Sequence, residues 1–503
     1  MRRSILALVT MVLVAGAGLA NAQTSPGDPD RGAQLFTKNA CAACHGPSGK
    51  GGQGPALLGP DWKFGGDDAS LAKSIRDGHQ PLMPPMGAAL GEQGIKDVIA
   101  YMRRTAANLS PEERARVDSF KSLGAPKGVV RSDLADFRVE TVAHVGPPYA
   151  FDFLPDGRIL VTETAGPLRV IDKGKLLPDP VADTPNGSIE GMTQALRRAM
   201  LSVAVHPDYA RNGWVYLLTA RVAPPTGDEK PREGLFPGTT TAQIVATITR
   251  GRIKDMRWVD TQKIAEFPVQ KTNSLRMKFD ARGRLYVGTL QSDPDYPGDG
   301  PGKLAQDLMS PIGKILRMKD DGSVPPDNPF VGRADANPYV FSYGHREPSG
   351  LTFDAAGELG AVEDGPRGGD ELNHIRPGRN YGWPISTWGH RYDNRPVGAN
   401  PDPQDIEQPV FNWNPAPAVS DVEYYAGKAF PRWTGSFFIG TMKQRDLIRV
   451  AVDGDRARAV EVVLHKVDRF RDIATGPDGY LYALLDGGDL IRLVPAEGAP
   501  KGK

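Results

Sequence analysis

The sequence predicts a small all-α domain followed by a much larger all-β domain. Two observations carry this prediction. Apolar residues in the first hundred positions recur at helical spacing around a single Cys-x-x-Cys-His sequence. From about residue 136 onward, β-rich apolar runs alternate with short turns of Pro, Asp and Gly. With 503 residues, of which 40% are hydrophobic and 24% charged, the chain can bury large cores in two or more domains.

Residues 1–22 have the pattern of a secretory signal peptide. Arg2 and Arg3 precede an apolar run from Ile5 to Gly18, and Ala20-Asn21-Ala22 is a small-residue cleavage site. We expect cleavage after Ala22 and export to the periplasm. An uncleaved anchor is the alternative, but neither this run nor any later segment reaches the roughly 20 apolar residues of a membrane span. The formal net charge of +1 gives no indication of nucleic-acid binding.

The Cys41-x-x-Cys44-His45 sequence predicts a covalent haem. Its spacing lets two thiols form thioethers to haem vinyl groups while the adjacent histidine ligates the iron. These are the only cysteines in the chain, so no second pair completes a tetrahedral zinc site. A disulfide across three residues closes a loop too short to stabilise much, and it gives His45 no role.

Residues 23–109 contain what a small haem domain needs. Asp30 can cap a first helix, a second helix is expected from Leu71 to Asp77, and a last helix carries Ile95, Val98, Ile99 and Met102 on one face. A proline-rich loop with Met83 and Met86 precedes that last helix. This order resembles class I cytochrome c, and the resemblance implies that Met83 is the sixth iron ligand, with Met86 as its rival. A His/Met pair favours electron transfer over oxygen chemistry.

Residues 110–135 are rich in charge and poor in large apolar groups, so we interpret them as a linker. The repeated pattern that follows, from 136 to 503, consists of six hairpin units. They cover Tyr149–Val161, Val203–Leu217, Leu275–Val287, Leu351–Gly357, Val422–Ile439 and Ile473–Tyr482. Six such units predict a six-bladed β-propeller, because radial repetition buries both faces of small antiparallel sheets. A β-sandwich is the competing architecture.

Seven sequence segments in this region resemble the soluble quinoprotein glucose and aldose sugar dehydrogenases. They appear in the order found in that family: Gly313–Arg317 with Asp321–Pro325 and Asp327–Phe330, Ser342–Arg346, Gly365–Glu371, Asn380–Pro384, Trp413–Pro415, Lys443 and Arg469–Asp472. The resemblance covers residues 136–495. It implies a six-bladed propeller that holds pyrroloquinoline quinone (PQQ) and calcium.

The resemblance also implies roles for individual residues. Arg346, Lys443, Arg469 and Arg471 are cations suited to the three carboxylates of PQQ. The backbone carbonyls of Gly365 and Pro366 are expected to hold the calcium that polarises the quinone. Glu371 and the carbonyl of Tyr381 are expected at a second, structural calcium, and oxygen donors of this kind suit a hard cation.

The proton-abstracting side departs from the family. Thr272 stands where the resemblance implies a catalytic histidine, and threonine cannot accept a proton at neutral pH. The family's Gly-Asp is Leu290-Gln291 here, and a family glutamine is Arg197. The asparagine that follows the Gly-His-Arg sequence becomes Glu347.

We therefore expect Glu347, beside Arg346, to act as general base, with Lys271 as its competitor. His206 has a counterpart outside the reaction centre of the family, so we expect a structural role for it.

These observations predict an exported oxidoreductase in which a PQQ propeller oxidises a small-molecule sugar, alcohol or lactol. Electrons would pass to the fused haem c and then to a downstream acceptor of the respiratory chain. One alternative is a non-catalytic, ligand-binding propeller beside a carrier haem, which the loss of the histidine favours. Another is PQQ catalysis on a substrate that is not a sugar.

Overall fold

The computed structural model of the chain describes most of both domains. It covers residues 26–39, 41–45, 48–50, 56–58, 62, 64–79, 83, 85–111, 113–114, 122–164, 166–186, 200–222, 232–233, 240–241, 244–270, 272, 274–291, 304–391, 396–397 and 405–496. The predicted signal peptide, Arg197 and Lys271 lie outside the described residues.

The described residues of the N-terminal domain include the helices α1 (Pro29–Lys38), α2 (Cys41–His45), α3 (Asp68–Asp77) and α4 (Gly87–Ala107). The N-cap of α1 is Asp28, whose side chain accepts the backbone N–H groups of Asp30 and Arg31, so the predicted capping role of Asp30 is wrong. Asp30 lies in the first turn instead and pairs with Arg104 of α4 at 2.8 Å.

The helical domain is held together by the contact of α1 with α4. A Cβ on Gly32 of α1 would overlap the carbonyl oxygen of Asp97, so glycine allows this close approach. The Asp97 side chain accepts the Asp28 backbone N–H at 2.8 Å and pairs with Arg31 at 2.5 Å. The predicted apolar face of α4 is buried, and it packs with Phe36, Leu71 and Ile75 in one core.

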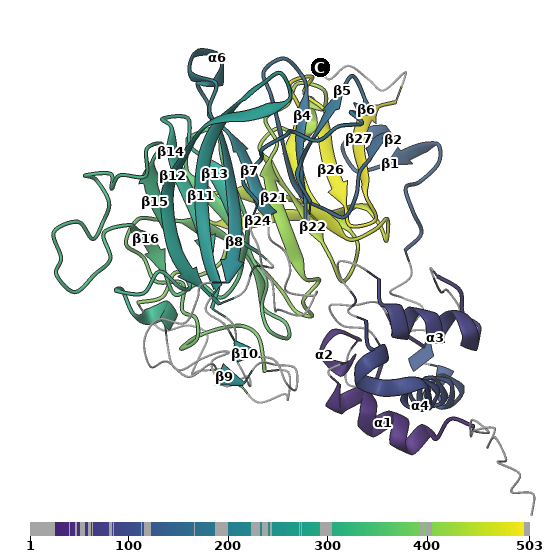
Figure 1. The fold of residues 1–503 in the computed structure, drawn as a ribbon. Helices are drawn as coiled ribbons and strands as arrows, with labels where there is room; N and C mark the ends of the chain where they lie inside the picture. Colours follow the sequence, from purple (N-terminus) through teal and green to yellow (C-terminus); the bar gives the residue numbers. More distant parts are fainter. Residues whose placement is uncertain are drawn as a thin grey trace, which may run out of the picture.

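The C-terminal domain is a six-bladed β-propeller (Figure 1). Blade one contains β3 (Pro148–Phe153), β4 (Ile159–Glu163), β5 (Leu168–Asp172) and β6 (Lys175–Leu176). Blade two contains β7 (Met200–Val205), β8 (Val215–Val222), β11 (Ile244–Lys254) and β12 (Arg257–Val269). Blade three contains β13 (Arg276–Phe279), β14 (Arg284–Thr289), β15 (Lys314–Lys319) and β16 (Val340–Tyr343).

Blade four contains β17 (Pro348–Phe353), β18 (Leu359–Glu363), β19 (Asp370–Ile375) and β20 (Phe411–Trp413). Blade five contains β21 (Val419–Tyr424), β22 (Ser436–Thr441), β23 (Leu447–Asp453) and β24 (Arg456–Leu464). A separate pair, β9 (Arg232–Glu233) and β10 (Thr240–Thr241), and the short helix α6 (Tyr209–Asn212) are outside the blades.

Each of the six predicted hairpins supplies the first strand of one blade. In five of them the predicted range also covers the second strand or its beginning. The first and second strands of these blades pair antiparallel. The Pro-Asp-Gly type turns join first to second strands, as at Gly157 and Gly283, where φ is positive. The propeller prediction is confirmed.

The sixth blade joins both ends of the domain. It consists of β25 (Phe470–Thr475), β26 (Leu481–Leu485), β27 (Asp489–Pro495), β2 (Asp136–His144) and β1 (Val129–Arg131). Strand β2 pairs antiparallel with β27, with Phe137 opposite Pro495. Strand β1 lies within the residues predicted as a linker, so this part of the linker is folded into the propeller.

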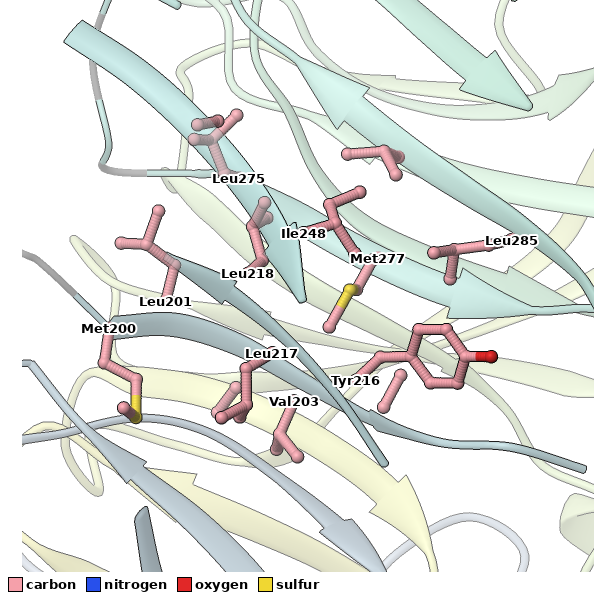
Figure 2. Close-up of a cluster of buried hydrophobic side chains, with 14 of the residues drawn as sticks. Met200, Leu201, Val203, Tyr216, Leu217, Leu218, Ile248, Leu275, Met277 and Leu285 are labelled. Carbon is pink, nitrogen blue, oxygen red and sulfur yellow. The ribbon is translucent and has the colours of Figure 1, made fainter. Parts of the chain in front are cut away.

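The largest apolar core lies between the first three blades. Figure 2 shows the side chains of blades two and three packed face to face, among them Leu201, Leu217, Leu275 and Leu285, each 0% exposed. Strand β7 is buried on both faces, so the sequence of that strand reads as a continuous apolar run rather than as an alternation.

Phe137 tests how much the closing strand contributes to stability. Its side chain is 0% exposed, and its ring meets Trp433 at 5.5 Å and Phe430 at 6.4 Å in edge contacts with blade five. Phe137→Ala should lower the free energy of unfolding by about 3–5 kcal/mol because it leaves a cavity. Urea denaturation followed by tryptophan fluorescence measures this. Val129→Ala, at a 48% exposed position in β1, should change it by less than about 0.5 kcal/mol.

Candidate active site

The predicted site residues of the propeller lie at one of its two ends. In an antiparallel blade, the start of the first strand, the end of the second and the start of the third lie at the same end. Arg346 and Arg469 directly precede first strands, Gly365 lies between β18 and β19, and Lys443 lies between β22 and β23. We call this the site end. Helix α6, which follows a first strand, marks the opposite end in Figure 1.

Two of the predicted arginines converge on one carboxylate. Arg471 donates from Nε to Asp486 at 2.6 Å, and Arg469 Nε lies 3.5 Å from the same carboxylate. Both guanidinium groups also contact the Met442 sulfur, at 3.6 and 3.7 Å. Since Met442 directly precedes Lys443, three of the four predicted cations come from adjoining parts of blades five and six.

A further cation belongs to this group, although the sequence analysis did not identify it. Arg445 is half-buried, and its Nε and Nη1 atoms have no hydrogen-bond partner among the described residues. Burial lowers the pKa of Arg445, and burial with the neighbouring charges of Arg471 and Arg445 lowers the pKa of Arg469 to about 10. Three buried or half-buried arginines here have only Asp468 and Asp486 as neighbouring carboxylates. This excess of positive charge fits the binding of an anionic ligand.

Arg346 and Glu347 occupy the blade-four side of the site end. Glu347 accepts a hydrogen bond from the Ser274 hydroxyl at 2.6 Å, and its other oxygen lies 3.4 Å from Arg346 Nη1. The Glu347 side chain is only 13% exposed. Arg346 Nη1 also donates to the carbonyl of Asp364.

Glu347 therefore lies beside the stretch that contains Thr272, the position at which a catalytic histidine was expected from the resemblance. Thr272, two residues before Ser274, is 1% exposed, and its carbonyl accepts the Tyr149 hydroxyl at 3.4 Å. The contact between Ser274 and Glu347 joins blades three and four and was not predicted. Ser274 and Glu347 are 73 positions apart, and no local pattern in the sequence indicates their contact.

Three of the four expected calcium ligands, Gly365, Glu371 and Tyr381, line one small cavity of about 20 Å³, and Pro366 is not among its lining residues. The residues expected at two separate calcium sites therefore lie close together, around a space with room for one water-sized group. Glu363 and Asp364 also line it. Burial, with the nearby charge of Glu363, raises the pKa of Glu371 to about 8. A cation would relieve this cost, so the donor set fits a hard ion.

Backbone geometry in the loop after β18 matches that expectation. A Cβ on Gly365 would overlap the carbonyl of Gly368, and Gly369 has a φ of 73°. The loop is thus compact enough to turn carbonyl oxygens inward. Among the described residues, no group of three or more Asp, Glu, His or Cys side chains is placed to hold a metal ion.

Two other residues from the sequence analysis are structural. The Gln291 backbone N–H donates to the Arg346 carbonyl at 2.7 Å, and its side chain accepts the Ala305 N–H at 2.5 Å. His206 lies after β7, at the end opposite the site, where its Nδ1 contacts the Asp208 N–H at 3.0 Å and Asn212 at 2.8 Å. The predicted structural role of His206 agrees with this position.

The predicted haem residues share one apolar core in the helical domain. Cys41 of α2, Met83 and Met86 all pack against the cluster formed by Phe36, Leu71 and α4. Met83 pairs with His79 through two backbone hydrogen bonds of 2.8 and 2.9 Å. The Cys44 side chain lies outside the described part of the chain. A thiol and two thioethers around one apolar cluster, with His45 on the same helix as the thiol, fit a haem.

Comparisons with known proteins agree with this division. Residues 145–492 match the family described as glucose/sorbosone dehydrogenase, and residues 27–102 match cytochrome c oxidase, cbb3-type, subunit III. An aldose sugar dehydrogenase of Escherichia coli is 33% identical over 365 residues, which cover 69% of this chain and 90% of that relative. A cbb3-type oxidase subunit of Azorhizobium caulinodans is 37% identical over 84 residues, 16% of this chain and 28% of that protein.

Solved structures show the same likeness. The apo-form of the soluble aldose sugar dehydrogenase from Escherichia coli has a TM-score of 0.62 and 31% identity, covering 72% of this chain and all of that one. The PQQ-bound form of an aldose sugar dehydrogenase from Streptomyces coelicolor has a TM-score of 0.53 and 25% identity, covering 72% and 98%. None of the helices described in the structure is long and apolar enough to cross a membrane.

Proposed function

This chain belongs to the glucose/sorbosone dehydrogenase family, with a cbb3-type cytochrome c domain at its N-terminus, and from that premise we propose that it is a periplasmic PQQ dehydrogenase. It oxidises a sugar or another alcohol or lactol and passes the electrons to its own haem c. The observation that carries the proposal is the group of buried cations at the site end, in a chain that also has a haem-attachment sequence.

The cations supply the binding shell for the cofactor. Lys443, Arg469, Arg471 and Arg346 bind the carboxylates of PQQ, and bidentate arginine pairing fixes the orientation of the planar ring. Arg445, whose buried nitrogen atoms lack partners among the described residues, adds a fifth cation beside Arg469. Carbonyl oxygens of Gly365 and Pro366 hold one calcium, and Glu371 with the Tyr381 carbonyl holds a second.

The cofactors supply the redox chemistry: bound PQQ takes two electrons from the substrate, and the haem iron carries them singly. The chain supplies the proton acceptor. Glu347 is the general base, because its carboxylate lies beside Arg346 and is oriented by the Ser274 hydroxyl. Lys271 is the competitor for this role.

The connector supports electron transfer within one chain. Glu113 pairs with Lys50 of the helical domain at 2.5 Å, while the Leu123 and Gly124 backbone N–H groups donate to Lys466 and Val467 of the propeller. Lys466 and Val467 precede β25, so this anchor lies at the site end. In Figure 1 the helical domain lies at the same end. The peptide units between Arg114 and Ser122 reach no further than about 30 Å.

Reconstitution tests the proposal directly. Adding PQQ and calcium to the purified protein, followed by substrates from a panel of sugars and alcohols, should reduce the haem with a rate independent of protein concentration. Stopped-flow absorbance of the haem measures this rate, and a chelator added before PQQ should abolish the reaction. A rate that rises linearly with protein concentration would show transfer between molecules. No haem reduction with any substrate would favour the non-catalytic alternative.

The haem ligand can be tested without any substrate. Met83→Ala should abolish the weak near-infrared iron–sulfur band of the oxidised protein, because Met83 is the proposed sixth ligand. Met86→Ala is the matched control, since both methionines pack against the same core and both changes remove the same side chain. Loss of the band in Met86→Ala, with its retention in Met83→Ala, would assign the ligand to Met86. Acid-acetone extraction should leave the haem attached in both variants.

Glu347→Gln tests the proton acceptor, because it preserves shape and removes basicity. With PQQ bound, substrate-driven haem reduction should fall by roughly two to four orders of magnitude. Ser274→Ala should cause a smaller loss, because it removes only the hydroxyl that orients the carboxylate. Both variants are measured by stopped-flow absorbance of the haem, as in the reconstitution experiment, and PQQ absorbance verifies that the cofactor is bound. Unchanged turnover in Glu347→Gln would show that Glu347 is not the general base, and Lys271 would then be the next residue to test.

A further inference from the structure

The reaction proposed above releases protons as well as electrons. Oxidation of an alcohol to a carbonyl breaks an O–H and a C–H bond and yields two electrons and two protons. The haem iron accepts the electrons one at a time and accepts no proton. The protons therefore leave by a path other than the haem, and the inference about that path rests on the proposed function.

The axis of the propeller is lined by two tiers of charged side chains. The six first strands surround this axis, and residues two apart on a strand face the same side. The first tier, nearer the site end, contains Arg276, Asp421 and Asp472. The second tier contains Lys278, Glu423 and Asp152. Lys278 and Glu423 lie two residues after Arg276 and Asp421 on the same strands, and Asp152 lies at the equivalent level of β3.

The first tier touches the cofactor shell and contains two adjacent carboxylates. Arg276 donates from Nη2 to the Arg471 carbonyl and from Nη1 to the Tyr149 carbonyl at 3.2 Å. The Ile473 backbone N–H donates to Asp421 at 2.8 Å and to Asp472 at 3.1 Å. Burial, followed by the charge of Asp472, raises the pKa of Asp421 well above its usual range. The two carboxylates thus share one backbone N–H, and burial favours the protonated form of Asp421.

The second tier leads from this pair toward solvent. Lys278 Nζ lies 3.5 Å from Glu423, and its side chain is 39% exposed whereas that of Glu423 is 11% exposed. Burial raises the pKa of Asp152 to about 6. Residues two apart on a strand are separated by about 7 Å, a gap that one water molecule bridges. Strands β7 and β17, which complete the wall, carry no ionisable side chain.

A purely structural role does not explain why these residues are acids. Each carboxylate accepts a backbone N–H from the next first strand, as Asp472 does from Phe151 and Asp152 from Val205, both at 2.7 Å. Neutral hydroxyls make the same contact between other blades: Thr352 accepts the Tyr424 N–H at 3.0 Å, and Ser202 accepts the Met277 N–H at 3.4 Å. Holding neighbouring blades together thus requires no charge.

We infer that the charged side chains of the first strands form a proton route around the propeller axis, from the cofactor shell toward the opposite end. The Asp421–Asp472 pair is the first carrier, and Glu423 and Asp152 pass the proton on to solvent. Arg276 and Lys278 balance part of the negative charge, so the carboxylates can lose and regain a proton in turn. In this route a proton released at the site end protonates the pair, and the pair releases a proton to the second tier.

The shared proton is tested first in the protein without PQQ or substrate. Infrared difference spectroscopy across a pH titration should show the carbonyl stretch of a protonated carboxylic acid at neutral pH. Asp421→Asn should remove one component of this band and leave the component of Glu371, whose pKa is about 8. Asparagine retains an acceptor for the Ile473 N–H but cannot carry the proton. An unchanged band in Asp421→Asn would overturn the inference.

The route itself is tested in the protein loaded with PQQ and calcium. A pH-indicator dye in weakly buffered solution should report proton release at least about tenfold slower in Asp421→Asn, with a larger solvent deuterium isotope effect on haem reduction. Thr352→Val is the matched control, because it removes a contact between blades but no titratable group. Its proton release should equal that of the unaltered protein.

The two assays separate failure of the route from failure of the function. Equal slowing in Asp421→Asn and Thr352→Val would identify a structural effect and overturn the route. Proton release in Asp421→Asn at the unaltered rate would do the same. Unaltered protein that shows the infrared band but no substrate-driven haem reduction would overturn the proposed function and the route with it.

Discussion

Antiparallel pairing of β2 with β27 is the constraint on which the rest of the structure depends. It closes the ring of blades, and with β1 it gives the sixth sheet five strands rather than four. Because the fifth strand of an antiparallel sheet runs parallel to the first, β1 begins at the same end as β25. The chain therefore enters the propeller at the site end. The hydrogen bonds of Leu123 and Gly124 to Lys466 and Val467 follow from this geometry. An even number of strands would have brought the connector to the opposite end.

The site end of the propeller contains a group of buried arginines and, separately, a group of buried carboxylates, which suit an anionic and a cationic ligand respectively. Guanidinium groups are crowded together at the site end, where burial lowers the pKa values of Arg445 and Arg469. A few residues away, carboxylates are buried with the opposite consequence, as the pKa of about 8 at Glu371 shows. Both arrangements cost free energy in the absence of ligands and are stabilised when ions of opposite sign arrive. Binding of an anionic cofactor and a hard cation would thus stabilise the folded protein as well as equip it for chemistry.

The architecture could be predicted from the sequence because its signals are local. A turn such as that at Gly157 and the apolar runs beside it identify a hairpin wherever it occurs, and the spacing of Cys41, Cys44 and His45 predicts a haem. Contacts between blades have no such signal: Ser274 and Glu347 are 73 positions apart, and nothing nearby marks either as a partner of the other. The same holds for Asp421 and Asp472. At the start of α1, Asp28 and Asp30 are both good capping residues, and only the fold reveals that the chain turns at the first of them.

Closure by the two ends of the propeller also determines the order in which this protein matures. During synthesis the helical domain emerges first, and the contacts of its core all lie within its own residues, so it can fold while the propeller is still incomplete. Strands β1 and β2 emerge next, yet their partner β27 is made last. Until then they expose unpaired edges, which are sites for aggregation.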